Sequence, residues 1–123
     1  MYLVDTNILV LAIDQKEPDY SFLQKIILKN QLYLSVICIG EYLSKATIEA
    51  EEEIDKLINT FPILPIDLEI AKIAAEYRKK FLKTKRGQLL DYFLAAQAKL
   101  NKLTLVTHNK ADFPMKDIKV ISP

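Results

Sequence analysis

The sequence predicts an α/β fold: a three-layer sandwich with a mainly parallel central sheet of about four to five strands, flanked by helices. Short runs that are apolar on both faces alternate with segments of helical periodicity, as in parallel sheets with helical crossovers. Half of the residues are hydrophobic and 27% are charged, which is typical of a globular chain. With 123 residues and no linker-like tract, residues 1–123 are predicted to form one domain.

In the first part of the chain, predicted strands alternate with predicted helices. Residues 2–4 are a short apolar run suited to a buried strand, and the threonine that begins residues 6–13 could cap a helix. Residues 19–29 carry apolar side chains at helical spacing. Residues 32–37 indicate a second buried strand, and a helix is predicted across residues 40–46.

The remaining elements follow from similar signals. A helix is predicted around residues 54–58, because the acidic run before it suits a helix amino terminus. Two prolines limit the segment "FPILPID" to a short edge strand. One apolar face predicts a helix over residues 67–81, and the nearly uniform apolar character of residues 88–100 predicts a buried central helix. Two more strands are predicted at residues 103–106 and 118–121.

Three carboxylates stand alone in apolar stretches. Asp5, Glu41 and Asp91 are each the only charged residue in a run of a dozen or more, so no Lys or Arg of the same run neutralises them. Acidic side chains are rarely buried without a partner, a hydrogen bond or a metal. Each acid taken alone has a second interpretation, a side chain that points to solvent. Three together favour a shared acidic site.

The predicted positions of these acids support a shared site. Asp5 follows the first strand, Glu41 follows the second, and Asp91 begins the buried helix, so all three can reach the carboxyl edge of the sheet, where α/β folds bind ligands. Two carboxylates about 4 Å apart repel by roughly 4 kcal/mol at an effective dielectric near 20. A cluster therefore needs a cation or bound protons, and oxygen-only ligands favour Mg²⁺ or Mn²⁺ over zinc.

The stretch "VTHNKADF" offers a further candidate after a predicted strand. It contains Thr107, Asn109 and Asp112, whose alternative role is ordinary turn chemistry. His108 is the only histidine, and its neighbours give no reason to assign it a role as a base, so a surface position is predicted.

A basic segment, "RKKFLKTKRG", precedes the Asp91 helix. It is interpreted as a phosphate-binding patch or as a solvated helix end, and the two are compatible. Its basic residues are Arg78, Lys79, Lys80, Lys83, Lys85 and Arg86.

The net charge of +1 does not by itself indicate nucleic acid or membrane as a partner. The single cysteine, Cys38, excludes an intrachain disulfide and a zinc site made of cysteines alone, and it is compatible with the cytoplasm. The apolar amino-terminal stretch lacks a basic leader and is interrupted by Asp5 and Asp14, so neither a signal peptide nor a membrane span is expected.

Four segments in order, "VDTNIL", "VICIGEYL", "LLDYFLAAQA" and "VTHNKADF", resemble the PIN-domain family, and among its members the VapC-type toxin ribonucleases. The resemblance covers essentially the whole chain and implies a parallel sheet flanked by helices. By this resemblance Asp5 and Asp91 are direct ligands of Mg²⁺ or Mn²⁺, while Glu41 and Asp112 complete the acidic set. The side chains that would hold these carboxylates or the attacking water are Thr6, Asn7, Thr107 and Asn109.

The resemblance further implies a metal-dependent endoribonuclease that leaves a 3′-hydroxyl and a 5′-phosphate. It also implies a homodimer and a small VapB-like antitoxin over the active site. Apolar helix faces in residues 22–28 and 54–58 could pair between copies, or they could pack into the core of one copy.

The sequence departs from the family pattern at two positions, and three other functions are alternatives to the toxin ribonuclease. Cys38 stands where many relatives have Ser or Thr, and "GQLLD" lacks the proline that relatives often carry directly before the Asp. The chain could instead be a PIN-type nuclease of RNA processing or decay without an antitoxin, or an inactive PIN-like binding module. A phosphatase with an aspartate nucleophile is disfavoured, because it normally needs an acid where this chain has Asn7.

Overall fold

The computed structural model describes residues 1–81 and 88–123. Its centre is a sheet of five strands in the order β3-β2-β1-β4-β5, and every neighbouring pair is parallel. The strands are β1 (Tyr2–Val4), β2 (Leu32–Ser35), β3 (Ile63–Leu64), β4 (Thr104–Val106) and β5 (Val120–Ile121). The predicted fold class is thereby confirmed.

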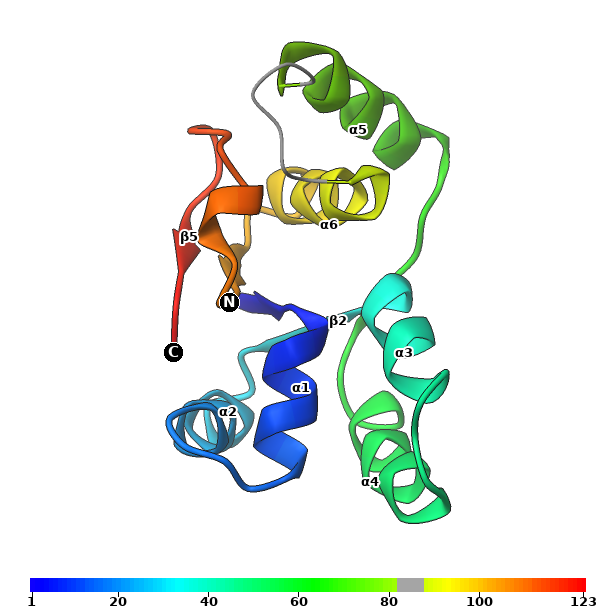
Figure 1. The fold of residues 1–123 in the computed structure, drawn as a ribbon, viewed down its shortest axis with the longest axis vertical. Coiled ribbons are helices and arrows are strands. Elements are labelled where there is room, and N and C mark those ends of the chain that lie inside the picture. The colour runs from blue at the N-terminus through cyan, green and yellow to red at the C-terminus, as the bar shows by residue number, and fades with distance from the viewer. Residues whose placement is uncertain (82–87) are drawn as a thin grey trace.

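Helices cover both faces of this sheet (Figure 1). The pair α1 and α2 packs together on one side of β1, and the pair α5 and α6 packs together on the other. The helices are α1 (Thr6–Ile13), α2 (Asp19–Leu28), α3 (Val36–Leu43), α4 (Ile48–Ile58), α5 (Leu68–Phe81) and α6 (Leu89–Leu100), with a short 3₁₀ turn, η1 (Lys110–Asp112).

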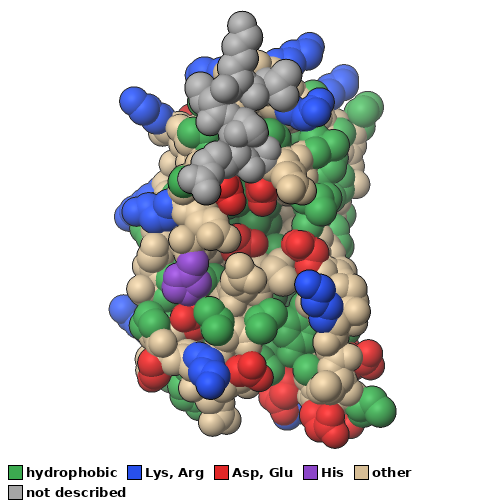
Figure 2. All heavy atoms as spheres, viewed as in Figure 1, with side chains coloured by type: hydrophobic (Ala, Val, Ile, Leu, Met, Phe, Trp, Pro, Cys, Tyr) green, Lys and Arg blue, Asp and Glu red, His purple; other side chains and the backbone are tan. Residues whose placement is uncertain are grey.

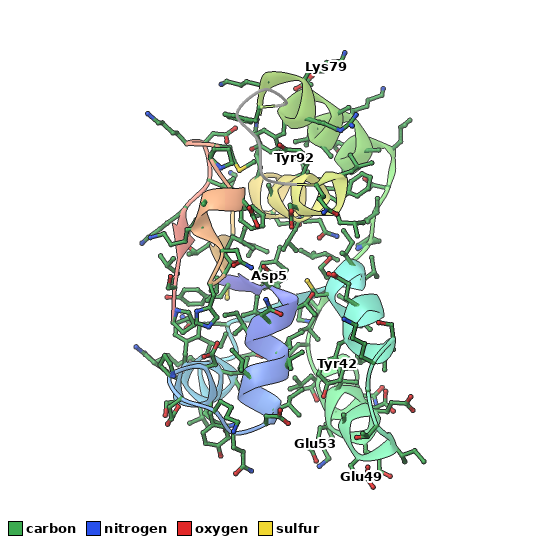
Figure 3. All side chains as sticks on the ribbon, viewed as in Figure 1. Asp5, Tyr42, Glu49, Glu53, Lys79 and Tyr92 are labelled. Atoms are coloured by element: carbon green, nitrogen blue, oxygen red, sulfur yellow. The ribbon has the colours of Figure 1, made fainter. Side chains whose placement is uncertain are left out.

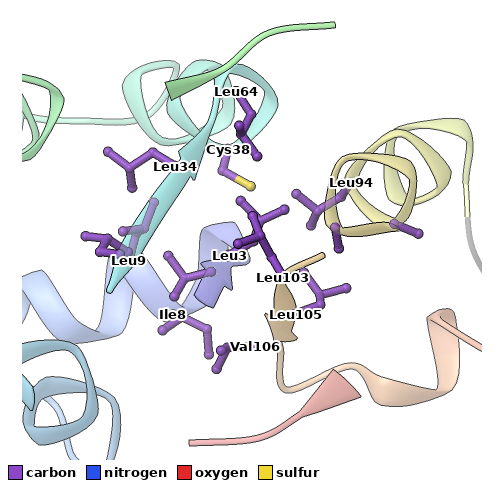
Figure 4. Packing of buried hydrophobic residues seen from close by; sticks show 14 of the residues in the cluster. Leu3, Ile8, Leu9, Leu34, Cys38, Leu64, Leu94, Leu103, Leu105 and Val106 are labelled. Atoms are coloured by element: carbon purple, nitrogen blue, oxygen red, sulfur yellow. The ribbon is translucent and has the colours of Figure 1, made fainter. Parts of the chain in front are cut away.

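The core lies between the sheet and its two helical layers (Figure 4). Leu3, Leu34 and Leu105, from three adjacent strands, have no exposed surface. Residues 94–98 of α6 are all buried, as the uniform apolar pattern predicts, whereas Leu89 and Leu90 in its first turn are about half exposed. Burial of this apolar surface is the main driving force for the fold.

The second strand ends earlier than the sequence predicts. Ser35 turns the chain from strand to helix, because its hydroxyl accepts a hydrogen bond from the backbone N–H of Ile37 (3.2 Å) and caps α3. Val36 and Ile37 therefore belong to α3, although the apolar run extends the predicted strand to residue 37. The "FPILPID" segment contributes only the two-residue strand β3, as its prolines predict.

The order of the strands defines one special point of the sheet edge. The chain passes from β1 to β2 to β3 on one side, and then crosses to β4 on the other side of β1. Ligands of open α/β sheets bind at such a switch point, beyond the carboxyl ends of the strands. Because Val4 pairs with Val106, the next residues, Asp5 and Thr107, leave the sheet side by side at this point.

No helix in the described part of the chain combines the length and the apolar character that crossing a membrane requires.

Candidate active site

Asp5 is fixed at the switch point by three hydrogen bonds. It is the N-cap of α1, and its Oδ1 accepts from the backbone N–H of Thr6 (2.7 Å). Its Oδ2 accepts from the hydroxyl of Thr107 (2.8 Å), and its own N–H donates to the carbonyl of Val106 (2.9 Å). Figure 3 shows Asp5 at the start of α1, in the middle of the molecule. The carboxylate is therefore held in one orientation from both α1 and β4.

Glu41 is joined to the same point through Thr6. The Thr6 hydroxyl donates to Oε1 of Glu41 (2.8 Å), across 35 residues of sequence. Glu41 belongs to α3 and is exposed, whereas Thr6 is half-buried. One residue, Thr6, thus binds Asp5 through its N–H and Glu41 through its hydroxyl.

Asp91 approaches from α6, on the other helical layer. Its Oδ2 accepts from the backbone N–H of Gln88 (2.9 Å), so the carboxylate caps the helix that carries it. Burial is the largest cause that raises the pKa of Asp91, and the Gln88 N–H opposes it. The charges of Asp112, Asp5 and Glu41 raise this pKa further. The predicted acids therefore share one region of negative potential.

One cavity of about 600 Å³ brings the acids together. Asp5, Glu41 and Asp91 all line it, and acidic side chains gather in the middle of the face in Figure 2. Asp112 does not line the cavity, although its charge acts on Asp91. The cavity continues between α1 and the α3–α4 segment, away from the acids. Its lining there includes Val10, Asp14, Tyr42, Lys45, Ala46, Thr47 and Ala50.

The other predicted polar residues also lie at this site. Asn7 and Asn109 line the cavity, and Thr107 is buried behind Asp5. The backbone N–H of Asn109 donates to the hydroxyl oxygen of Thr107 (3.0 Å), which in turn donates to Asp5.

The donor set fits Mg²⁺ or Mn²⁺ in its chemistry. All candidate donors are oxygens, which suits these ions better than zinc. Within the described residues, no three His, Cys, Asp or Glu side chains are grouped closely enough to enclose a metal ion. Mg²⁺ does not require such a group, because it keeps several waters and is usually bound through one or two carboxylates. Asp5 and Asp91 line the same cavity, so two carboxylates are available there.

Comparison with known proteins places this chain in a family. Residues 2–119 match the PIN domain. The chain belongs to the PIN domain family. No curated protein matches this PIN domain significantly.

Several solved structures are similar to this PIN domain, and one of them is described as a toxin–antitoxin complex. VapBC2 from Rickettsia felis, bound to a DNA fragment from its promoter, aligns with a TM-score of 0.82 and 22% identity, over 99% of this chain and 98% of that chain. A toxin–antitoxin complex from Klebsiella pneumoniae aligns with a TM-score of 0.79 and 25% identity, over 96% of this chain and 95% of that chain. FitAcB from Neisseria gonorrhoeae aligns with a TM-score of 0.77 and 26% identity, over 98% of this chain and 96% of that chain.

Cys38, the departure from the usual Ser or Thr, is fully buried in this PIN domain. Burial raises the pKa of its thiol to about 12; Asp5 and Glu41 add to this, and Thr6 opposes it. The thiol is therefore neutral at physiological pH and adds no charge beneath the acids.

A buried polar network, which the sequence does not reveal, connects the helices that carry Asp91 and Glu41. Gln97 of α6 has no exposed surface; its Oε1 accepts from the Ser35 hydroxyl (2.6 Å), and its Nε2 donates to the carbonyls of Leu64 and Pro65 (both 3.0 Å). Because Ser35 caps α3, the side-chain amide of Gln97 links α6 to the start of α3. The only signal in the sequence is a polar residue in the apolar run "AAQA".

Half of the predicted basic patch lies on the last turn of α5. Arg78, Lys79 and Lys80 are exposed there, and Figure 3 shows Lys79 at the end of the molecule opposite to Glu49 and Glu53. The predicted residues Lys83, Lys85 and Arg86 lie outside the described residues.

The charge of Arg78 reaches the neighbour of Asp91. Burial raises the pKa of Tyr92, Asp91 raises it further, and Arg78 opposes both. Positive charge on α5 is thus electrostatically coupled to the acid-bearing turn of α6.

Proposed function

We propose that this PIN domain is a metal-dependent endoribonuclease and the toxin of a VapBC-type toxin–antitoxin pair. The observation that carries the proposal is the cavity at the switch point, which Asp5, Glu41 and Asp91 all line and in which the charges of Asp5 and Glu41 help to raise the pKa of Asp91. A bound cation would offset the repulsion between these carboxylates. A divalent cation held by carboxylates suits phosphodiester hydrolysis.

Each residue has a specific role in this proposal. Asp5 lines the cavity and is already oriented by Thr6 and Thr107, so it would lose little rotamer freedom on binding a cation. Asp91 supplies the second carboxylate, and Glu41 and Asp112 act directly or through water. Mg²⁺ or Mn²⁺, when bound, polarises the phosphoryl group and lowers the pKa of a bound water. Asn7 and Asn109, which line the cavity, supply polar contacts to that water or to the phosphate.

The expected test result is RNA cleavage that requires a divalent cation. Cleavage with Mg²⁺ or Mn²⁺ should leave 3′-hydroxyl and 5′-phosphate ends, and EDTA should abolish it. Asp91→Asn should reduce the rate by roughly 100-fold or more, because the carboxylate that it removes is one of two direct ligands. Leu28→Ala is a matched control, since Leu28 is 85% exposed and lies outside the cavity. Full cleavage in EDTA, or an unaffected Asp91→Asn enzyme, would refute the mechanism.

The separation of charge along the molecule supports binding of RNA from the α5 end. Arg78, Lys79 and Lys80 are exposed at one end, whereas α4 at the other end carries several exposed acids. A polyanion is attracted to the first end and repelled from the second, and phosphate contacts supply most of the affinity for RNA.

Reversal of these three charges should weaken RNA binding and its dependence on salt. In Arg78→Glu/Lys79→Glu/Lys80→Glu, the slope of log K against log salt should decrease by roughly 2, because each lost phosphate contact with a single strand contributes about 0.7. Fluorescence anisotropy with labelled RNA at several salt concentrations measures this slope. The triple variant Lys16→Glu/Lys25→Glu/Lys29→Glu changes the net charge equally at exposed sites and should retain the slope. Equal slopes for all three proteins would contradict the assignment.

The partner in the proposed pair is a small VapB-like antitoxin that covers the active site. The apolar part of the cavity, with Val10, Tyr42 and Ala46, offers a surface for such a segment beside the acids. The similar structures include VapBC2 from Rickettsia felis and a toxin–antitoxin complex from Klebsiella pneumoniae, which supports an antitoxin as the partner. A PIN nuclease of RNA processing is the second candidate, and a neighbouring gene for a small antitoxin distinguishes the two.

A homodimer is also part of the proposal. The helix faces that the sequence offers for pairing are used inside the protomer: Leu23, Ile26 and Ile54 are at most 3% exposed. Other apolar side chains remain exposed on α3 and at the start of α6, and these support an interface between copies. They are Val36, Leu43, Leu89 and Leu90, between 37% and 47% exposed.

A further inference from the structure

Asp19, the first residue of α2, is the one almost completely buried carboxylate among the described residues. Its side chain is 2% exposed, and it does not line the acidic cavity. A buried carboxylate is costly unless it is paired, and the amino terminus of a helix offsets only part of that cost. The proposed chemistry does not use Asp19, so its burial requires another explanation.

The partner of Asp19 is His108, the only histidine of the chain. The distance between Asp19 Oδ2 and His108 Nε2 is 2.6 Å, which is short for a hydrogen bond between nitrogen and oxygen. The two residues are 89 positions apart, so the contact joins α2 to the turn that follows β4. The imidazole itself is 36% exposed and is drawn in purple in Figure 2.

This turn consists of Thr107, His108 and Asn109, and it carries two groups of the acidic site. The Thr107 hydroxyl donates to Asp5, and the Asn109 N–H donates to Thr107. Asn109 also lines the cavity. His108 stands between them and bonds away from the cavity, to α2. The turn is therefore held on one side by Asp5 and on the other by Asp19.

We infer that Asp19 and His108 form a clamp that positions the turn 107–109, and through it the Asp5 carboxylate, for the reaction. Neither residue touches the reacting atoms, so both are positioning residues. The clamp acts on the site of the proposed function, and its relevance to catalysis rests on that function. The positioning of the turn by the clamp does not rest on the proposed function, because the hydrogen bonds of the turn can be measured without any substrate.

The first measurement is amide hydrogen exchange in the protein without substrate. In His108→Ala, the Asn109 amide should exchange at least about 10-fold faster, because its acceptor, the Thr107 hydroxyl, loses its fixed position. His108→Gln keeps an N–H donor that can reach Asp19, so it should restore most of the protection. Asp19→Asn keeps an acceptor of the same shape and should show a smaller increase. In wild-type protein, the single imidazole allows direct NMR assignment of a proton on Nε2.

A control for general loss of stability is Leu57→Ala. Leu57 is half-buried in α4 and packs against the core, and it takes no part in the hydrogen bonds that join the turn to Asp5 and Asp19. If Leu57→Ala accelerates Asn109 exchange as much as His108→Ala at equal loss of Tm, the pair is only a structural contact and the inference is wrong. Unchanged Asn109 exchange in His108→Ala overturns it as well.

The second measurement is RNA cleavage under saturating metal. His108→Ala should lower kcat by roughly 10- to 100-fold with KM nearly unchanged, because supporting contacts around a metal ligand have effects of that size. His108→Gln should recover most of kcat. An unchanged kcat overturns the catalytic part of the inference. If the wild-type protein cleaves no RNA, the proposed function fails, whereas hydrogen exchange still decides whether the clamp exists.

Discussion

Replacement of Gln97 with leucine is expected to lower the free energy of unfolding by about 2–4 kcal/mol. The side chain would fit the apolar surroundings, but the Ser35 hydroxyl and the carbonyls of Leu64 and Pro65 would lose their partner. Each buried polar group without a partner costs about 1–3 kcal/mol. Thermal unfolding should show a fall in Tm of roughly 10 °C. Wild-type stability in this variant would show that the network contributes nothing.

A second substitution at the same position separates hydrogen bonding from shape. Gln97→Glu preserves the size of the side chain but replaces its N–H donors with an acceptor that faces two carbonyls. The buried carboxyl should have a pKa above its unfolded value, so the variant should lose stability as the pH rises through that interval and regain part of it in acid. Asn101→Ala is the matched control. It removes a partly exposed bond to the Gln97 backbone and should change stability by less than about 0.5 kcal/mol.

Asp5→Asn is expected to abolish cleavage while the fold remains as stable as the wild type. Asparagine is as good an N-cap as aspartate, so α1 keeps its cap, whereas the proposed cation site would lose one of its two direct carboxylates. RNA cleavage should fall by roughly 100-fold or more. Asp5→Ala should lose cleavage and also about 0.5–2 kcal/mol of stability, because alanine does not cap the helix.

The pH dependence of stability is a second measurement of the effect of Asp5→Asn. The folded protein raises the pKa of Asp91 above its unfolded value, so stability decreases as the pH rises through the carboxyl range. Part of this rise comes from Asp5. Asp5→Asn should therefore unfold at a Tm no lower than the wild type at pH 7, and any gain should shrink below about pH 4. Unfolding followed by circular dichroism from pH 3 to 8 tests this. Equal cleavage by Asp5→Asn and wild type would contradict the assignment of Asp5.

The sheet and the acidic cavity are predictable from the sequence because both depend on patterns that are local. Strands of a parallel sheet are apolar on both faces, and a carboxylate directly after such a strand, like Asp5, must leave at the carboxyl edge. The boundary of α3 is not predictable in this way. Val36 and Ile37 favour a strand by composition, and the competing influence is one hydrogen bond to Ser35.

The contacts that connect distant segments are the part that sequence reasoning misses. The partners of Gln97 include two backbone carbonyls, which carry no signature of residue type. Asp19 begins a helix, a position that the helix dipole favours for an acid, and nothing near it in the sequence indicates a contact with a histidine 89 residues away. His108 is indeed exposed, as predicted, but one of its ring nitrogens holds a buried acid.

The hydrogen bond between Asp5 and Thr107 spans 102 residues, and this separation sets the order in which the site can be completed during synthesis. A ribosome that has made α1, α3 and the start of α6 has already produced Asp5, Glu41 and Asp91. The central strand β1 at that stage lacks β4, its neighbour on one side. Asp5 therefore gains its hydrogen bond from Thr107 only after one of the last strands of the sheet has been made, so a nascent chain contains Asp5, Glu41 and Asp91 well before the orientation of Asp5 is fixed.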